Sequence, residues 1–75
     1  MTQVQILINA PEKARKLCNI LSRYYGAFDL GKGSYRVDGK SILGIYTMDL
    51  SEPLTLSIYG EEEGVIEAIR EFVIK

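Results

Sequence analysis

Two segments of the chain alternate between apolar and mainly polar residues, and this alternation restricts the fold more than any other feature. The segments are 3–8 and 54–59, and each places an aliphatic side chain at every second position (Val4, Ile6, Ile8, Leu54, Leu56 and Ile58). Successive side chains of a β-strand point to opposite faces of a sheet, so each strand has one strongly apolar face. We therefore expect a sheet with one face buried under helices and the other open to solvent.

Apolar residues at helical spacing follow the first strand and return near the C-terminus. The first stripe predicts a helix over 11–25 that begins at Pro11, is capped by Asn9 or Ala10 and ends at Gly26. It consists of five residues spaced three or four apart: Ala14, Leu17, Cys18, Leu21 and Tyr25. The second stripe predicts a last helix with the run 61–63 of three glutamates in its first turn. Its members are Val65, Ile66, Ile69, Phe72 and Val73.

The middle of the chain holds two short strands and a short helix. Apolar and polar residues alternate over 27–30 and 35–37, and the glycines of the segment 31–34 suit a hairpin turn. Ser41 is a good N-cap for a helix that Pro53 and the residues before it end. The order βαββαβα predicts an α+β open-faced sandwich, with a four-stranded antiparallel sheet and three helices on one face, formed by residues 1–75 as a single domain.

The short helix after Ser41 carries more apolar side chains than one face can bury. At about 100° per residue, Ile42, Leu43 and Tyr46 lie near one another, whereas Ile45 and Met48 project from roughly the opposite side. One group can enter the core, and the other must face water or a partner. An apolar patch at a surface is typical of a recognition site, so this pattern favours docking over catalysis.

Composition disfavours several functional classes. No apolar run approaches the ~20 residues needed to span a bilayer, so we expect a cytoplasmic protein without membrane contact. The net charge of −1 and the pI of about 5.3 argue against a nucleic-acid-binding protein. The chain has no histidine and no Cys or His pair with metal-ligand spacing, which disfavours an enzyme, a metal site or a cofactor. The single cysteine, Cys18, is expected to be a small core residue.

The charges are unevenly distributed. Residues 1–40 contain seven Lys or Arg and three Asp or Glu, whereas residues 41–75 contain two and seven. Four of the basic residues belong to the first predicted helix: Lys13, Arg15, Lys16 and Arg23. A solvated helix face and an anion-binding site explain this cluster equally well.

The segment 38–45, Asp-Gly-Lys-Ser-Ile-Leu-Gly-Ile, set in a βαββαβα chain of this length, resembles the regulatory-serine region of HPr. HPr is the phosphocarrier of the bacterial sugar phosphotransferase system. The resemblance extends through the order of elements over nearly the whole chain. In the family, the first helix begins with a Gly-Ile-His-Ala-Arg-Pro-like motif, and the matching stretch here is 11–16. Ala14 and Arg15 agree with that motif, whereas Lys13 stands where the phosphoacceptor histidine would be.

The resemblance implies a relative of HPr that has lost the carrier reaction. A lysine is protonated at neutral pH and has no lone pair to attack phosphorus. Lys13 is then either a solvent-facing residue or, with Arg15, part of an anion-binding helix terminus. Ser41 matches the serine that HPr kinase phosphorylates in Gram-positive members, and a simple helix cap is an equally good interpretation of it.

The resemblance also implies which side of the short helix binds proteins. By position, the patch beside the serine consists of Ile42, Leu43 and Tyr46, with Ile45 and Met48 turned into the core. In the family, this patch contacts Enzyme I, the sugar-specific transport proteins and, when the serine is phosphorylated, a catabolite control transcription regulator. We expect a monomer that docks through the patch together with Lys13 and Arg15.

A ferredoxin-like module is the alternative interpretation. Such a βαββαβ core senses a small ligand or dimerises through its open sheet face. Burial of that face against a second copy, together with a fully packed short helix, would favour the ferredoxin-like module. The polar side chains of the face are Gln3, Gln5, Thr55, Ser57 and Tyr59. An exposed Ile42 and Leu43 would favour docking.

Overall fold

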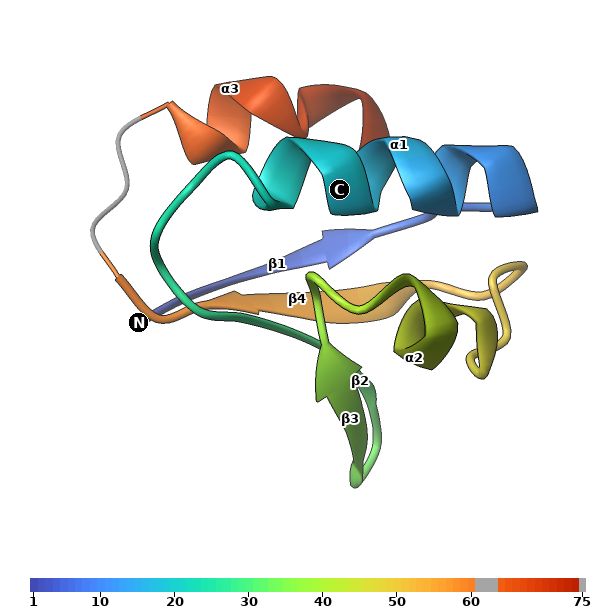
Figure 1. Cartoon of the computed structure of the whole chain (residues 1–75). Helices are drawn as coiled ribbons and strands as arrows, with labels where there is room; N and C mark the ends of the chain where they lie inside the picture. Colours follow the sequence, from blue (N-terminus) through green and yellow to red (C-terminus); the bar gives the residue numbers. More distant parts are fainter. Residues whose placement is uncertain (61–63, 75) are drawn as a thin grey trace.

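The computed structural model describes residues 1–60 and 64–74 and contains a four-stranded antiparallel sheet with its helices on one face (Figure 1). The strands are β1 (Thr2–Ile6), β2 (Phe28–Lys32), β3 (Tyr35–Asp38) and β4 (Leu54–Ile58). They lie in the order β1-β4-β2-β3, and each neighbouring pair is antiparallel. The predicted open-faced sandwich is confirmed.

The helical layer contains α1 (Pro11–Leu21), α2 (Ile42–Tyr46), α3 (Val65–Ala68) and the 3-10 helix η1 (Arg70–Phe72). In Figure 1, α1 and α3 lie together above the sheet, whereas α2 is separate from α3 and lies near β3. α2 contacts both α1 and β3. None of the helices in residues 1–60 and 64–74 has the length and apolar character needed to cross a membrane.

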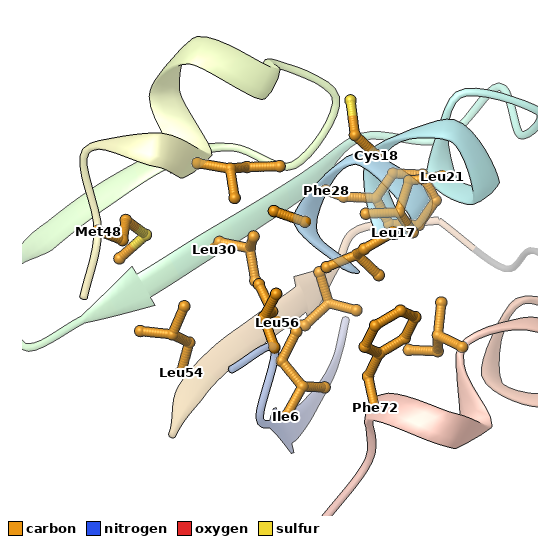
Figure 2. Close-up of a cluster of buried hydrophobic side chains, with 14 of the residues drawn as sticks. Ile6, Leu17, Cys18, Leu21, Phe28, Leu30, Met48, Leu54, Leu56 and Phe72 are labelled. Carbon is orange, nitrogen blue, oxygen red and sulfur yellow. The ribbon is translucent and has the colours of Figure 1, made fainter. Parts of the chain in front are cut away.

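The strand register sorts the side chains by face. Val4, Leu56 and Leu30 are direct neighbours across β1, β4 and β2, and all three belong to the face that carries the helices. α1 contributes Leu17 to this core and η1 contributes Phe72, and Figure 2 shows both side chains in the cluster around Leu56. The alternation of the sequence is therefore realised as a single core between the sheet and its helices.

The other face of the sheet is polar. Three pairs of side chains are hydrogen-bonded there: Gln3 with Ser57 (3.1 Å), Gln5 with Thr55 (2.7 Å) and Tyr59 with Asp29 (2.7 Å). The phenol of Tyr59 donates to the Asp29 carboxylate, and this hydrogen bond raises the pKa of Tyr59 because it favours the neutral phenol. Each of these hydrogen bonds joins two side chains of the same molecule.

The first helix is shorter than predicted. It ends at Leu21 with Ser22 as its C-cap, and Gly26 lies beyond the helix. After Leu21 the backbone tightens, since Arg23 N donates to Ile20 O and Tyr24 N to Leu21 O, each three residues back. This change of period turns Tyr24 toward the core and leaves Tyr25 fully exposed, so the predicted place of Tyr25 in the apolar stripe is wrong.

The last helix is also shorter than predicted, because the C-terminal residues pair with β1. Val73 forms an antiparallel bridge with Ile6. Leu7 N donates to Phe72 O at 2.8 Å, and Ile74 N donates to Gln5 O at 2.9 Å. The predicted stripe is therefore split between α3, η1 and this paired segment.

Members of the second stripe consequently differ in burial. Val65, Ile69 and Phe72 are buried, whereas Ile66 is exposed, which the stripe did not predict. The predicted helix start at 61–63 lies outside the described residues.

Candidate functional site

The turn at Asp38 and Gly39 sets the start of α2. Ser41 N donates to the Asp38 carbonyl at 3.0 Å, and Lys40 N donates to Asp38 Oδ1 at 2.9 Å. A Cβ added to Gly39 would lie only 2.9 Å from Phe28 Cβ, which is closer than such atoms approach in proteins. The backbone of Gly39 therefore packs directly on β2, and this contact fixes where Ser41 begins the helix.

Ser41 caps α2, as predicted. Its backbone is extended (φ −102°, ψ 103°), and its Oγ accepts a hydrogen bond from Gly44 N at 3.3 Å. The bond satisfies one of the amide groups that a helix start leaves without a partner. Ser41 is partly exposed, so this residue lies at the edge of the surface and not inside the core.

The two sides of α2 differ in burial as the sequence indicates. Ile45 is fully buried and Met48 nearly so, and both belong to the core. On the other side, Leu43 is 76% exposed and Tyr46 is 42% exposed. Ile42 lies between these extremes, because it is partly buried and packs against the core. We call Ile42, Leu43 and Tyr46 the α2 patch.

Tyr35 adds an aromatic side chain beside the C-terminal end of α2, which the sequence did not predict. Its phenol oxygen lies 2.6 Å from Thr47 Oγ1. Thr47 donates its only hydroxyl proton to Gly44 O at 2.6 Å, so Tyr35 is the donor in the first bond. The local pattern around Tyr35 carries no signal of this contact, because the contact depends on where the sheet places β3 beside α2.

A hollow of about 270 Å³ lies between α1 and α2. It brings Arg15 and Ile42 together, with Cys18 and Asn19 completing its lining. Cys18 is buried, as expected, and its thiol donates to the carbonyl of Lys40 at 3.3 Å. The hollow joins a basic side chain of α1 to the apolar α2 patch.

The ammonium group of Lys40 does not add charge to this hollow. It donates to the Tyr24 carbonyl and lies 5.5 Å from the centre of the Phe28 ring. The side chain of Lys40 therefore contacts β2 and the turn after α1, away from the hollow. No group of three or more His, Cys, Asp or Glu in the described part of the chain is arranged to hold a metal ion.

Lys13 is exposed in the first turn of α1 but does not join Arg15 at the hollow. Side chains two residues apart on a helix leave the axis about 160° apart, so a shared anion would have to lie beyond the N-terminal end of α1. The N-cap of α1 is Ala10, which makes no side-chain cap bond. The preceding residue, Asn9, has a left-handed backbone (φ 64°).

No family model and no curated protein matches the chain, whereas solved structures do. One is HPr-C-His from Thermoanaerobacter tengcongensis, with 26% sequence identity, a TM-score of 0.80 and coverage of 95% of this chain and 89% of that chain. Another is the phosphocarrier protein HPr from Bacillus anthracis, with 20% identity, a TM-score of 0.76 and coverage of 97% and 96%.

A third is a histidine-containing phosphocarrier protein of a mycoplasma. It is 16% identical, with a TM-score of 0.74 and coverage of 93% of this chain and 89% of that chain. All three proteins are covered over nearly their whole length, so the match is to a complete domain and not to a shared motif. The chain is therefore HPr-like, with the fold of the HPr phosphocarrier proteins across most of its length.

Proposed function

We propose that this HPr-like chain is a regulatory docking protein, not an enzyme, of the phosphoenolpyruvate-dependent sugar phosphotransferase system. It binds proteins of that system or a transcription regulator, and it works as a cytoplasmic monomer. The observation that carries the proposal is the exposed Leu43 next to the capping hydroxyl of Ser41 on an HPr fold. A large aliphatic side chain in water gains free energy when a partner covers it.

The chain does not carry phosphate in this proposal. It has no histidine, and so no imidazole that could accept a phosphoryl group from a donor protein. Lys13 does not replace it, because an exposed ammonium group is not a nucleophile. Incubation with labelled phosphoenolpyruvate and Enzyme I leaves the protein unlabelled, while a histidine-bearing HPr in the same tube is labelled. Stable transfer of label to this chain contradicts the proposal.

Docking uses the α2 patch, with Arg15 at its α1 side and Tyr35 at its β3 side. Aromatic and arginine side chains around an apolar centre are the composition that binding hot spots favour. Lys13 contributes through charge at the periphery, since it is exposed and is not part of the lining of the hollow that Arg15 lines.

A pull-down from cell lysate with wild-type and Leu43→Glu protein tests this surface. Tyr25→Glu is the matched control, because Tyr25 is a large side chain that is even more exposed than Leu43 and follows α1 instead of belonging to α2. Partners that survive Leu43→Glu do not use the patch.

Phosphorylation of Ser41 regulates the docking. A phosphate there adds about two negative charges beside the α2 patch, close to the free amide groups of the helix start. HPr kinase with ATP is expected to add one phosphate, which mass spectrometry detects and which Ser41→Ala abolishes. Ser34→Ala, an exposed serine of the β2–β3 turn, is the matched control. If Ser41→Ala protein is still modified, or if wild-type protein is not modified at all, regulation by phosphorylation of Ser41 is refuted.

The ferredoxin-like alternative receives no specific support. Its discriminating feature is a sheet face that needs a second copy, whereas the polar groups of that face are hydrogen-bonded in pairs within one chain. The exposed Leu43 supports docking instead. Sedimentation or light scattering that finds a dimer, together with protection of the sheet face from exchange, would reverse this preference.

A further inference from the structure

A second and larger hollow runs along α1 and reaches the C-terminal helices. It is an open groove of about 560 Å³. One wall belongs to α1 and the turn after it, and the other is formed by Ala68 of α3 and Glu71 of η1. Arg15 stands at the border between this groove and the hollow that faces α2, since it lines both.

The groove contains an apolar strip. Ile20 and Tyr24 contact the core and are only partly buried, so part of each side chain remains in reach of solvent. Ala68 is also partly buried and belongs to the same lining. Tyr24 leans toward the start of α3, where a Cβ on Gly64 would lie 3.8 Å from its hydroxyl. These residues offer apolar surface between two helices, which is where a third helix packs in helical assemblies.

The charges of the groove are partly compensated. Lys16 Nζ lies 2.8 Å from Glu71 Oε1, and this ion pair joins the two walls. Glu12 adds one more carboxylate at the N-terminal end of α1. The guanidinium groups of Arg15 and Arg23 have no ion-pair or hydrogen-bond partner among residues 1–60 and 64–74. The groove therefore presents two guanidinium groups that can donate hydrogen bonds to the carboxylates of a partner.

The length of the groove selects the shape of its occupant. Arg15 lies in α1 and Arg23 lies in the tighter turn directly after it, and their eight-residue separation corresponds to about 12 Å along a helix axis. One phosphate or one small carboxylate is much shorter than this distance, and it would leave the strip of Ile20 and Tyr24 uncovered. A helix of two or three turns covers both features at once.

We propose that this groove binds an acidic amphipathic helix of a partner protein. The apolar side of that helix covers Ile20, Tyr24 and Ala68, and its carboxylates pair with Arg15 and Arg23. The surface is separate from the α2 patch, so an HPr-like chain of this kind can hold two partners, one beside α2 and one between α1 and α3. Arg15 and Asn19 line both this groove and the hollow that faces α2, so these two residues form the border between the two surfaces.

The test uses two synthetic helical peptides of about 18 residues, long enough for roughly five turns. Both carry a leucine stripe; one flanks it with glutamates and the other with glutamines. The 15N-labelled protein is titrated with each peptide, and amide shifts are followed by NMR. The glutamate peptide is expected to shift Ile20, Arg23, Tyr24 and Ala68, and to bind about tenfold more tightly than the glutamine peptide at low salt.

Variants separate this groove from the α2 patch. Arg23→Glu is expected to weaken binding of the glutamate peptide about tenfold, whereas Arg23→Lys retains most of it. Leu43→Glu leaves it unchanged, so failure of the groove and failure of the α2 patch are distinguishable. Arg23 is exposed, so its substitution is expected to leave the fold intact. Circular dichroism of each variant checks this.

Three results overturn the proposal. The first is a set of peptide-induced shifts centred on α2 instead of the groove. The second is equal binding of the two peptides. The third is an equal set of groove shifts with inorganic pyrophosphate, which would identify a small-anion site.

Discussion

Substitution of Gly39 by alanine tests the packing that places α2. Two effects oppose each other. Removing a glycine restricts the unfolded chain and stabilises a protein by about 0.4–1 kcal/mol where the new residue fits. Here the new Cβ would lie 2.9 Å from Phe28 Cβ, 3.1 Å from Leu21 Cδ1 and 3.3 Å from Phe28 O. The last of these atoms is backbone of β2 and cannot move without disturbing the sheet.

The overpacking effect therefore prevails. Extra atoms in a packed core cost about 1–3 kcal/mol, so we expect Gly39→Ala to lower the free energy of unfolding by about 1–2 kcal/mol. For a domain of this size, each kcal/mol corresponds to a fall in Tm of about 4–8 °C. Urea denaturation followed by circular dichroism measures the change, and a lower midpoint with an unchanged slope attributes it to the folded state.

Gly33 is the matched control, because an added Cβ there has free space but the backbone conformation is unfavourable for a residue with a side chain. Its φ is +61°, and nothing lies within 4 Å of an added Cβ. Alanine there costs about 1 kcal/mol through its backbone conformation alone, and asparagine costs less because it tolerates the left-handed region. At Gly39, asparagine is larger than alanine and must be worse. If asparagine is better than alanine at both glycines, or if Gly39→Ala is as stable as wild type, the steric argument is refuted.

Four further outcomes are expected. Leu43→Glu leaves the urea midpoint unchanged, since the side chain is mostly in water, while it abolishes partner capture. Ser41→Ala removes a long cap bond of 3.3 Å and costs about 0.5–1 kcal/mol, measured by the same denaturation. Phe72→Ala empties a buried site and costs about 3 kcal/mol or more, seen as a large loss of Tm. Asp29→Asn lowers the pKa of Tyr59, measured by NMR of 13C-labelled tyrosine. The raised pKa means that the folded state holds this proton more tightly, so its contribution to stability is present below about pH 10 and is lost as the pH rises further.

Local patterns predicted most of the architecture. The segment 54–59 alternates strictly and contains β4, and the cap chemistry of Ser41 located the start of α2. Both features depend on near neighbours in the sequence. The predicted burial of Tyr25 is wrong for a related reason. The apolar stripe predicts helical spacing past Leu21, whereas the backbone tightens there.

Other features depend on tertiary contacts that no local pattern contains. Val73 fits the apolar stripe of a helix, yet it pairs with Ile6, because the free edge of β1 offers hydrogen bonds that a longer helix would leave unmade. The contact of Tyr35 with Thr47 and the groove along α1 likewise depend on how distant elements meet. At the site, Arg15 lines the hollow beside α2 and Lys13 does not, although the two residues belong to one stretch of the sequence.

The pairing of β1 affects when the chain can fold during synthesis. β1 is made before the other strands of this sheet, but its two neighbours are β4 and the segment around Val73, which come later in the sequence. A nascent chain that ends before residue 54 holds an N-terminal strand with nothing beside it, and its apolar face has no sheet to join. β4 must therefore leave the ribosome before β1 acquires its partner in the sheet, and until then the apolar side chains of β1 stay without the packing that they have in the folded domain.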